Sequence, residues 1–198
     1  MNGPEVLVQR LAAGEAVLFP TDTLPALAAR PEAAALLWRL KGRPADKPLI
    51  LMGADLPQLV AALGIPWQEP WLDQARRCWP GAFTLVLPIG GKITGQLHPG
   101  GTSLGLRVPA CPQALELLRL TGPLATTSAN RSGEPPATTA IDAGRQFPGL
   151  ARLGPLPWPE GSGQGSTVLA WRGSGEGGVH PWQVLRAGAA SAPAGPAV

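Results

Sequence analysis

Short apolar runs that stop at a proline, a glycine or a polar motif recur along this chain and limit what it can fold into. The run 16–19 ends at Pro20, and the run 83–87 is apolar apart from one threonine. Such runs are typical of buried strands. Helical patterns lie between them without strict alternation, which predicts an α/β fold with a twisted mixed β-sheet flanked by helices. The expected strands are 16–19, 49–51, 83–87, 104–108, 123–126, 166–171 and 182–186, and the expected helices lie before Gly14 and over 31–40, 56–63, 72–79 and 112–120.

The chain length of 198 residues fits one compact domain. A Pro/Gly-rich connection over 154–165 precedes the last two expected strands, which a turn over Gly173–Gly178 would join. The C-terminal residues are Ala, Pro and Gly without a core-forming pattern. We therefore expect a domain over 1–188 and a disordered tail over 189–198.

Composition limits where the protein acts and what it binds. No apolar run is long enough to span a membrane, and no secretory signal is visible at the N-terminus. With only Cys78 and Cys111, a disulfide framework is not expected, so the prediction is a cytoplasmic protein with no membrane contact. Arginine supplies 13 of the 16 basic residues, a residue suited to phosphate and carboxylate, although arginine-rich codon usage would give the same excess.

Several catalytic motifs are absent from the sequence. It contains neither the G-x-x-x-x-G-K-[ST] phosphate loop nor a G-x-G-x-x-G after a strand. The only histidines, His98 and His180, each stand beside a proline, which argues against a zinc site or a Ser-His-Asp triad. Cys78 has no evident histidine partner and is interpreted as a packed thiol. No residue is assigned to a metal.

Polar residues instead gather where the apolar strands begin or end, the usual position of ligand sites in α/β sheets. Hydroxyls and Asn130 would supply directional hydrogen bonds, and the basic residues would neutralise phosphate. Taken singly, each has a simpler explanation as a helix cap, a turn former or a solvated helix end. The residues concerned are Thr21, Asp22, Thr23, Lys41, Arg43, Ser103, Arg107, Thr126, Ser128, Asn130, Ser166 and Arg186.

Seven motifs in one order make the sequence resemble the YrdC-like family of threonylcarbamoyl-AMP synthases, in its single-domain form. The resemblance covers nearly everything between Val6 and Gly188 and implies the family's twisted sheet with a central basic cavity. The motifs are Pro20-Thr21-Asp22-Thr23, Lys41-Gly42-Arg43-Pro44, Trp79-Pro80-Gly81-Ala82-Phe83-Thr84, Leu106-Arg107-Val108-Pro109, Ser128-Ala129-Asn130-Arg131-Ser132-Gly133, Ser166-Thr167-Val168 and Leu185-Arg186-Ala187-Gly188.

The resemblance also implies roles for particular residues. The expected catalytic set is Lys41, Arg43, Ser128 and Asn130, around ATP. Further ATP contacts would come from Lys47, Ser103 and Arg186, and the expected threonine contacts are Thr23, Arg107, Thr126 and Ser166. Three positions depart from the family: Pro25-Ala26 replaces Tyr-Gly, Met52 stands where many members have a threonine-contacting histidine, and Pro136 replaces a serine.

The implied activity is the nucleotidyl transfer that forms threonylcarbamoyl-AMP and pyrophosphate from L-threonine, bicarbonate or CO2, and ATP with Mg²⁺. The product would pass to a tRNA threonylcarbamoyltransferase complex for the modification of a tRNA adenosine, and a weak contact with RNA is left open. Two alternatives remain at this point. One is an enzyme of the same fold that uses another small acid or carbamoyl donor; the other is a non-catalytic nucleotide- or RNA-binding module.

Overall fold

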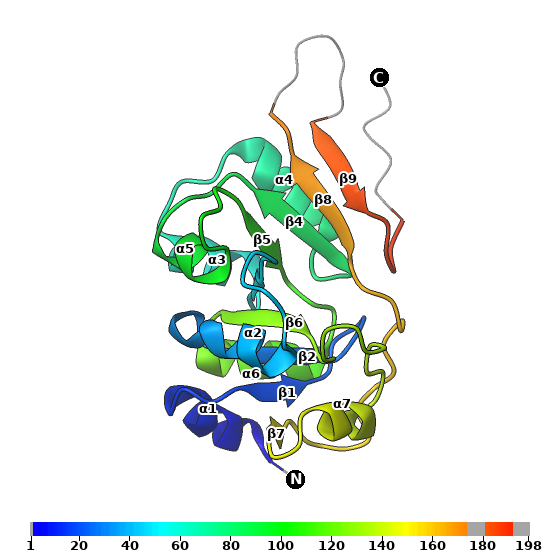
Figure 1. Cartoon of the computed structure of the whole chain (residues 1–198). Helices are drawn as coiled ribbons and strands as arrows, with labels where there is room; N and C mark the ends of the chain where they lie inside the picture. The colour runs from blue at the N-terminus through cyan, green and yellow to red at the C-terminus, as the bar shows by residue number, and fades with distance from the viewer. Residues whose placement is uncertain (1, 174–180, 192–198) are drawn as a thin grey trace.

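One mixed sheet runs through the molecule in a computed structural model that describes residues 2–173 and 181–191 (Figure 1). Its nine strands follow the order β7-β1-β2-β6-β3-β5-β4-β8-β9. The strands are β1 Val17–Phe19, β2 Ala26–Ala29, β3 Ile50–Met52, β4 Phe83–Leu87, β5 Leu104–Arg107, β6 Leu124–Ser128, β7 Ala151–Arg152, β8 Thr167–Trp171 and β9 Trp182–Arg186. The helices are α1 Pro4–Ala12, the 3₁₀ helix η1 Pro31–Ala33, α2 Ala35–Lys41, α3 Leu56–Leu63, α4 Glu69–Cys78, α5 Lys92–Leu97, α6 Pro112–Thr121 and α7 Ala140–Gln146.

The sheet is mixed, as the sequence predicts. β1 pairs with β7, β3 with β5 and β4 with β8 in parallel, while the other five pairs are antiparallel. All seven expected strands form, with ends that shift by no more than two residues, and the five expected helices also form. The α/β class with helices beside a mixed sheet is therefore confirmed.

Four elements were not expected from the sequence. β2 is built largely of alanine, which has a low preference for strands, and it forms because all four of its residues are buried between β1 and β6. α5 contains Gly95, and α7 contains Gly144. Glycine weakens the helical pattern in both helices. β7 has two residues, too few for a recognisable pattern.

The expected turn over Gly173–Gly178 and the expected tail over 189–198 fall only in part within the described residues. The turn over Gly173–Gly178 lies outside the described residues apart from Gly173, and residues 192–198 of the expected tail also lie outside them. The tail's described beginning is hydrogen-bonded, since the Ala189 N–H donates to Gly165 O at 2.9 Å.

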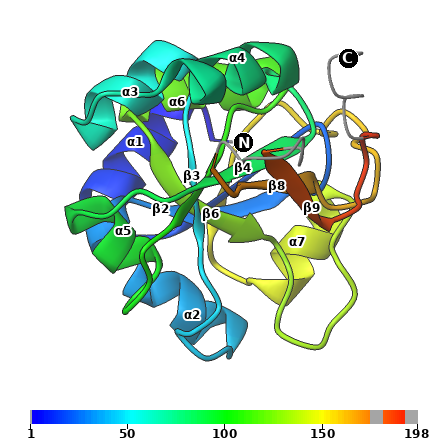
Figure 2. The ribbon, with the colours of Figure 1, turned by 90° about the horizontal axis from the view of Figure 1, so that it is seen from above.

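Alternating side chains divide the sheet into two faces. On one face Leu18, Leu51, Leu85 and Leu106 belong to the larger apolar cluster. On the other face a smaller cluster holds residues of α1, α6, β1 and β2, and it stops at Met52 and Leu124. Beyond these two residues the second face carries both polar and apolar side chains. Figure 2 shows α1 and α6 gathered on one side of the molecule, with α2 and α7 on the opposite side.

Within the described parts of the chain, none of the helices has both the length and the apolar character needed to cross a membrane.

Candidate active site

A cavity of about 480 Å³ lies on the second face of the sheet, where the smaller apolar cluster ends. Strands β2 to β6, β8 and β9 all contribute to its lining. Eight of the residues to which the resemblance assigned an ATP or threonine contact line it: Thr23, Arg43, Ser103, Arg107, Thr126, Ser128, Ser166 and Arg186. Lys41, Lys47 and Asn130 are not among the lining residues.

Strand register explains why residues far apart in the sequence share this cavity. Residues directly opposite each other on paired strands point to the same face. Ile50 pairs with Gly105, and Gly105 pairs with Val86, which makes an apolar row across the floor. Met52 pairs with Arg107 in the next row. The polar and apolar parts of the lining are therefore set by the pairing of β3, β5 and β4.

A register shift between β8 and β9 determines where Arg186 points. Leu169 pairs with Val184, but Val168 pairs with Arg186, so Leu185 is an extra residue in β9. A β-bulge of this kind re-aims the side chains that follow it. If the pairing of Leu169 with Val184 continued without a shift, Arg186 would pair with Thr167 and face away from the cavity; in the structure it pairs with Val168 and lines the cavity.

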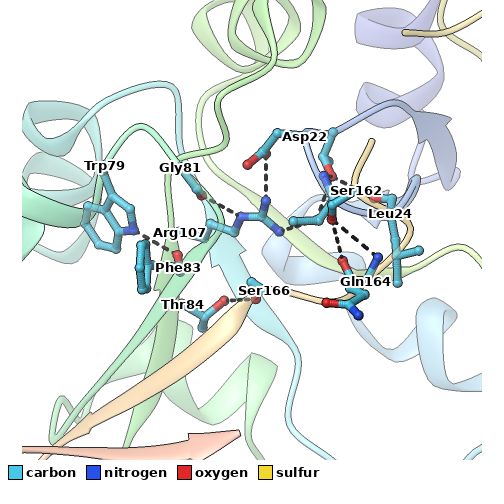
Figure 3. A network of polar contacts seen from close by, with 12 residues as sticks. Asp22, Leu24, Trp79, Gly81, Phe83, Thr84, Arg107, Ser162, Gln164 and Ser166 are labelled. Atoms are coloured by element: carbon cyan, nitrogen blue, oxygen red, sulfur yellow. Dashed lines mark hydrogen bonds and ion pairs between the residues drawn. The ribbon is translucent and has the colours of Figure 1, made fainter. Parts of the chain in front are cut away.

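Arg107 is the centre of a buried polar network (Figure 3). Its side chain is 5% exposed, and its Nη2 lies 2.7 Å from Asp22 Oδ1 in an ion pair. Nη1 donates to Thr23 Oγ1 at 2.8 Å, and Nε donates to Gly81 O at 3.2 Å. Burial lowers the pKa of Arg107, and the Asp22 carboxylate acts against this shift. Three of the five guanidinium N–H groups are thus engaged, which leaves two for a ligand.

Hydrogen bonds within the loop that carries Asp22, and from a neighbouring segment, hold this loop in place. Thr21 Oγ1 donates to Leu24 O at 2.7 Å, and Thr21 Oγ1 and Thr23 Oγ1 lie 3.0 Å apart. The Pro/Gly-rich connection over 154–165 lies against this loop, and its Ser162 N–H donates to Asp22 O at 3.0 Å. A Cβ at Gly161 would lie 2.2 Å from Thr23 O, so only glycine allows this close approach.

Hydroxyl groups near Arg107 complete this end of the cavity. Thr84 Oγ1 and Ser166 Oγ lie 2.7 Å apart, and both residues are buried. Arg186 Nη2 donates to Ser166 O at 2.8 Å. Thr126 is 1% exposed, and its Oγ1 has no hydrogen-bond partner among the residues that the structure describes. A buried hydroxyl of this kind is expected to bind a ligand or an ordered water.

Lys41 does not line the cavity, and its ammonium group is hydrogen-bonded to the loop over 128–130. Gly42, with φ 63°, ends α2 in the left-handed conformation and lets the chain reverse between Lys41 and Arg43. Lys41 Nζ donates to Ser128 O at 2.7 Å, to Asn130 Oδ1 at 3.2 Å and also to Asn130 O. Ser128 Oγ donates to Asn130 Oδ1 at 2.6 Å. All three ammonium hydrogens therefore have protein acceptors, which makes Lys41 and Asn130 positioning residues for Ser128 in this structure.

Arg43 is fixed by backbone carbonyls and leaves part of its guanidinium unpaired. Nη2 donates to Lys47 O and Pro48 O, each at 3.1 Å. Nε is buried, and no partner for it lies in the described residues. Burial lowers the pKa of Arg43, while Asp46 acts in the opposite direction. The Lys47 side chain is exposed, and it is the carbonyl of this residue that contributes to the site.

The Lys41 ammonium is expected to make stability depend on pH. Burial, and after it the positive charge of Arg43, lower the pKa of Lys41 from 10.5 to about 8. Between these two values the unfolded chain holds a proton that the folded protein has lost, so the free energy of unfolding should rise with pH. The rise is at most about 3 kcal/mol. Denaturant titrations from pH 7 to pH 11 should show this rise in the wild type and not in Lys41→Met, with Cys78 contributing equally to both. If the free energy of unfolding had the same pH dependence in both proteins, Lys41 would not be the cause of the rise.

Neither an activated cysteine nor a metal-binding cluster is found in the part of the chain that the structure describes. Burial raises the pKa of Cys78 to about 11, and burial also raises that of Cys111, so neither thiol is activated as a nucleophile. Nowhere in residues 2–173 or 181–191 do three His, Cys, Asp or Glu side chains gather in a group that could hold a metal ion.

Sequence reasoning assigned no ligand contact to four residues that the structure brings to the site. Asp22 and Thr84 stand inside recognised motifs, but no role was assigned to either. Gly161 lies in a Pro/Gly-rich segment where a required close approach cannot be told from a flexible loop. His98 lines the cavity, although its position beside a proline pointed only to a loop.

Comparison with known proteins identifies the family. The family profile Sua5/YciO/YrdC, described as telomere recombination, matches residues 9–188. This chain belongs to the Sua5/YciO/YrdC family. The resemblance predicted from the seven motifs is thereby confirmed.

Relatives of this Sua5/YciO/YrdC member include two proteins named threonylcarbamoyl-AMP synthase. The one from Bacillus subtilis is 37% identical over 176 residues, which cover 85% of this chain and 51% of the relative. The one from Pyrococcus abyssi is 40% identical over 141 residues, which cover 69% of this chain and 41% of the relative. The chain thus spans about half the length of these relatives.

The fold also matches a solved structure. The crystal structure of P. abyssi Sua5 complexed with L-threonine has a TM-score of 0.81 and is 32% identical. The match covers 93% of this chain and 54% of that chain.

Proposed function

We propose that this family member forms threonylcarbamoyl-AMP and pyrophosphate from L-threonine, bicarbonate or CO2, and ATP. The observation that carries the proposal is the single cavity that unites Arg107, Thr23 and Ser166 with Arg43, Ser128 and Arg186. Its three arginines support the basic character expected from the sequence. The relatives named threonylcarbamoyl-AMP synthase and the threonine complex of P. abyssi Sua5 support the same reaction.

At the nucleotide end, Arg43 is the strongest candidate for a phosphate contact. Its unpaired buried Nε and free Nη1 can donate to phosphate oxygens, while Nη2 stays fixed on two carbonyls. Ser103 and Ser128 add hydroxyl groups, and Arg186 brings a second positive charge. Lys41 and Asn130 act through the Ser128 loop that they hold. Lys47 is proposed to act through its backbone carbonyl on Arg43.

At the amino-acid end, Arg107 would bind the threonine carboxylate with its two remaining N–H groups. Thr23 and Ser166 frame the position next to this guanidinium. The unpaired Thr126 hydroxyl is available for the substrate's amino or hydroxyl group. Because Asp22 neutralises Arg107 and fixes its plane, the site presents an oriented fork of donors.

The chemistry requires no nucleophile from the protein. The threonine amine attacks the carbon of CO2 and loses a proton, or attacks the carbon of bicarbonate with loss of a water molecule; either way it gives an N-carboxylated amino acid. One oxygen of this new carboxylate attacks the α-phosphorus of ATP. The new P–O bond forms as the bond to the β-phosphate bridging oxygen breaks, and pyrophosphate leaves. Arg43 and Arg186 would offset the developing phosphate charge, and the cavity would hold both reactants in line.

Mg²⁺ would enter this reaction bound to ATP. The polar side chains that line the cavity are hydroxyls, three arginines and His98, and the nearby Asp22 carboxylate is occupied by Arg107. The protein groups therefore do not fit a metal cage of their own, and the steps assigned to the residues above do not use the ion.

We further propose that the product passes to a tRNA threonylcarbamoyltransferase complex in the cytoplasm. A mixed anhydride of a carbamate and a phosphate is a reactive acyl donor in water, so it suits an acceptor that is close at hand. A weak contact with RNA would assist this transfer.

The direct test supplies the protein with ATP, Mg²⁺, bicarbonate and isotopically labelled threonine. Threonylcarbamoyl-AMP, identified by mass, and an equal amount of pyrophosphate are expected. ATP binding without release of pyrophosphate, with any of several small amino acids, would instead favour the non-catalytic nucleotide-binding alternative.

Arg43→Ala is expected to weaken ATP binding about 10- to 100-fold, the range for a lost charge-assisted hydrogen bond. Calorimetric titration with ATP measures the effect. Replacement of Arg39, a basic residue in the last turn of α2 that does not line the cavity, is the matched control and should leave the affinity unchanged. Equal ATP affinity of Arg43→Ala and wild type would remove Arg43 from the nucleotide site.

Discrimination between amino acids is expected to be weak, because the departures from the family lie at the amino-acid end. Ala26 and Met52 line the cavity there, and a methionine thioether directs no strong hydrogen bond to a substrate hydroxyl. Preference for threonine over 2-aminobutyrate should stay below about 100-fold in kcat/KM.

Pyrophosphate release at matched amino-acid concentrations measures this preference. Met52→His should raise it by restoring an imidazole. If the wild type is strongly selective and Thr126→Val is not, the Thr126 hydroxyl supplies the contact instead.

A further inference from the structure

His98 is a part of the cavity that the proposed chemistry leaves without a role. It follows α5, and the sequence His98-Pro99-Gly100-Gly101 makes a tight turn in which Gly101 N–H donates to His98 O at 2.9 Å. Proline in the second position and Gly100 at φ 74° in the third are the features of a type II turn. The backbone at His98 is therefore set by local sequence.

Two contacts fix the imidazole on this turn. Its Nδ1 lies 2.8 Å from Ser103 O, and since a carbonyl oxygen can only accept, Nδ1 carries the proton. The ring also covers Gly101, where an added Cβ would lie 2.2 Å from Nδ1 and 2.3 Å from Cε1. In the neutral ring Nε2 is then an acceptor. It has no hydrogen-bond partner within residues 2–173 and 181–191.

The surroundings of His98 indicate what Nε2 would accept from. His98 shares the cavity lining with Ser103, to which the family resemblance assigned an ATP contact, and with the apolar row formed by Ile50, Gly105 and Val86. The arginines Arg107 and Arg186 are in the neighbouring row, with Met52, Thr84 and Val168. A flat apolar floor with one acceptor at its edge suits a purine base that carries an N–H donor.

We propose that His98 is a specificity-determining residue whose Nε2 accepts a hydrogen bond from the exocyclic amino group of adenine. The inference rests on the proposed use of ATP. Hypoxanthine has a carbonyl oxygen at the position of this amino group, and two acceptors facing each other repel. His98 thus favours adenine nucleotides over inosine nucleotides.

The test measures the affinities of ATP, ITP and purine riboside triphosphate, which lacks the amino group, for four proteins. Wild type should bind ATP about three- to tenfold more tightly than purine riboside triphosphate, the range for one neutral hydrogen bond, and should bind ITP more weakly still. In His98→Ala these preferences should largely disappear. His98→Gln, whose amide oxygen can take the place of Nε2, should recover part of the preference.

Gly101→Ala provides a variant that leaves His98 in the chain. Its Cβ occupies the space of the ring, so the imidazole must move and the preference for adenine should fall as in His98→Ala. Thermal unfolding of each variant separates a loss of fold from a loss of selectivity. Unchanged nucleotide preference in His98→Ala, with ATP still bound, overturns the inference alone. Absence of ATP binding by the wild type overturns the proposed function together with the inference.

Discussion

Arg107→Ala is expected to abolish detectable synthesis and to lower the free energy of unfolding by about 3–5 kcal/mol, the range for breaking one side of a buried ion pair. The loss is large because Arg107 is buried and its removal leaves the Asp22 carboxylate without its partner. Thr23 Oγ1 and Gly81 O lose donors in the same step. Chemical denaturation and pyrophosphate release measure the two effects.

A double-mutant cycle separates the structural part of this effect from the functional part. The Asp22→Ala, Arg107→Ala protein lacks the buried Asp22 carboxylate that Arg107→Ala leaves unpaired, so it should be more stable than Arg107→Ala alone. It should nevertheless remain inactive, because the proposed carboxylate ligand is still missing. Activity in the double variant would remove Arg107 from the amino-acid site. Additive stability losses would show that Asp22 and Arg107 are not coupled.

Residue pattern predicted the fold well wherever one local rule decided the structure. The strand over 83–87 and the helix over 56–63 have the expected bounds, because apolar runs and a helix-ending Gly64 leave little choice. β2 could not be predicted in the same way. Its Ala-Leu-Ala-Ala sequence takes the strand conformation from its neighbours β1 and β6, which is a tertiary effect.

The motifs brought eight expected residues to one cavity, but they did not predict how these residues are held there. The motif places Lys41 near Arg43 in the sequence. Only the structure shows that the Lys41 ammonium donates its hydrogen bonds to the loop over 128–130. Likewise His98 could be placed only when the turn and the Ser103 carbonyl were seen together. The hydrogen-bond partners of a side chain come from segments distant in sequence, so the spacing of residues within a motif does not predict them.

Arg186→Ala is expected to lower kcat/KM about 100- to 1000-fold. The register shift in β9 pairs Arg186 with Val168, and its side chain lines the cavity. Removal of the guanidinium takes away a proposed phosphate contact and the donor to Ser166 O, each a charge-assisted hydrogen bond of about 1.5–3 kcal/mol.

Two comparison proteins make the cause of this loss visible. Val184→Ala shortens an exposed side chain of the same strand that does not line the cavity, so it should retain most of the activity. Arg186→Lys keeps the positive charge without the fork of donors, so it should recover part of the activity. Steady-state kinetics with ATP as the varied substrate measure all four proteins. An Arg186→Ala variant as active as Val184→Ala would remove Arg186 from the nucleotide site.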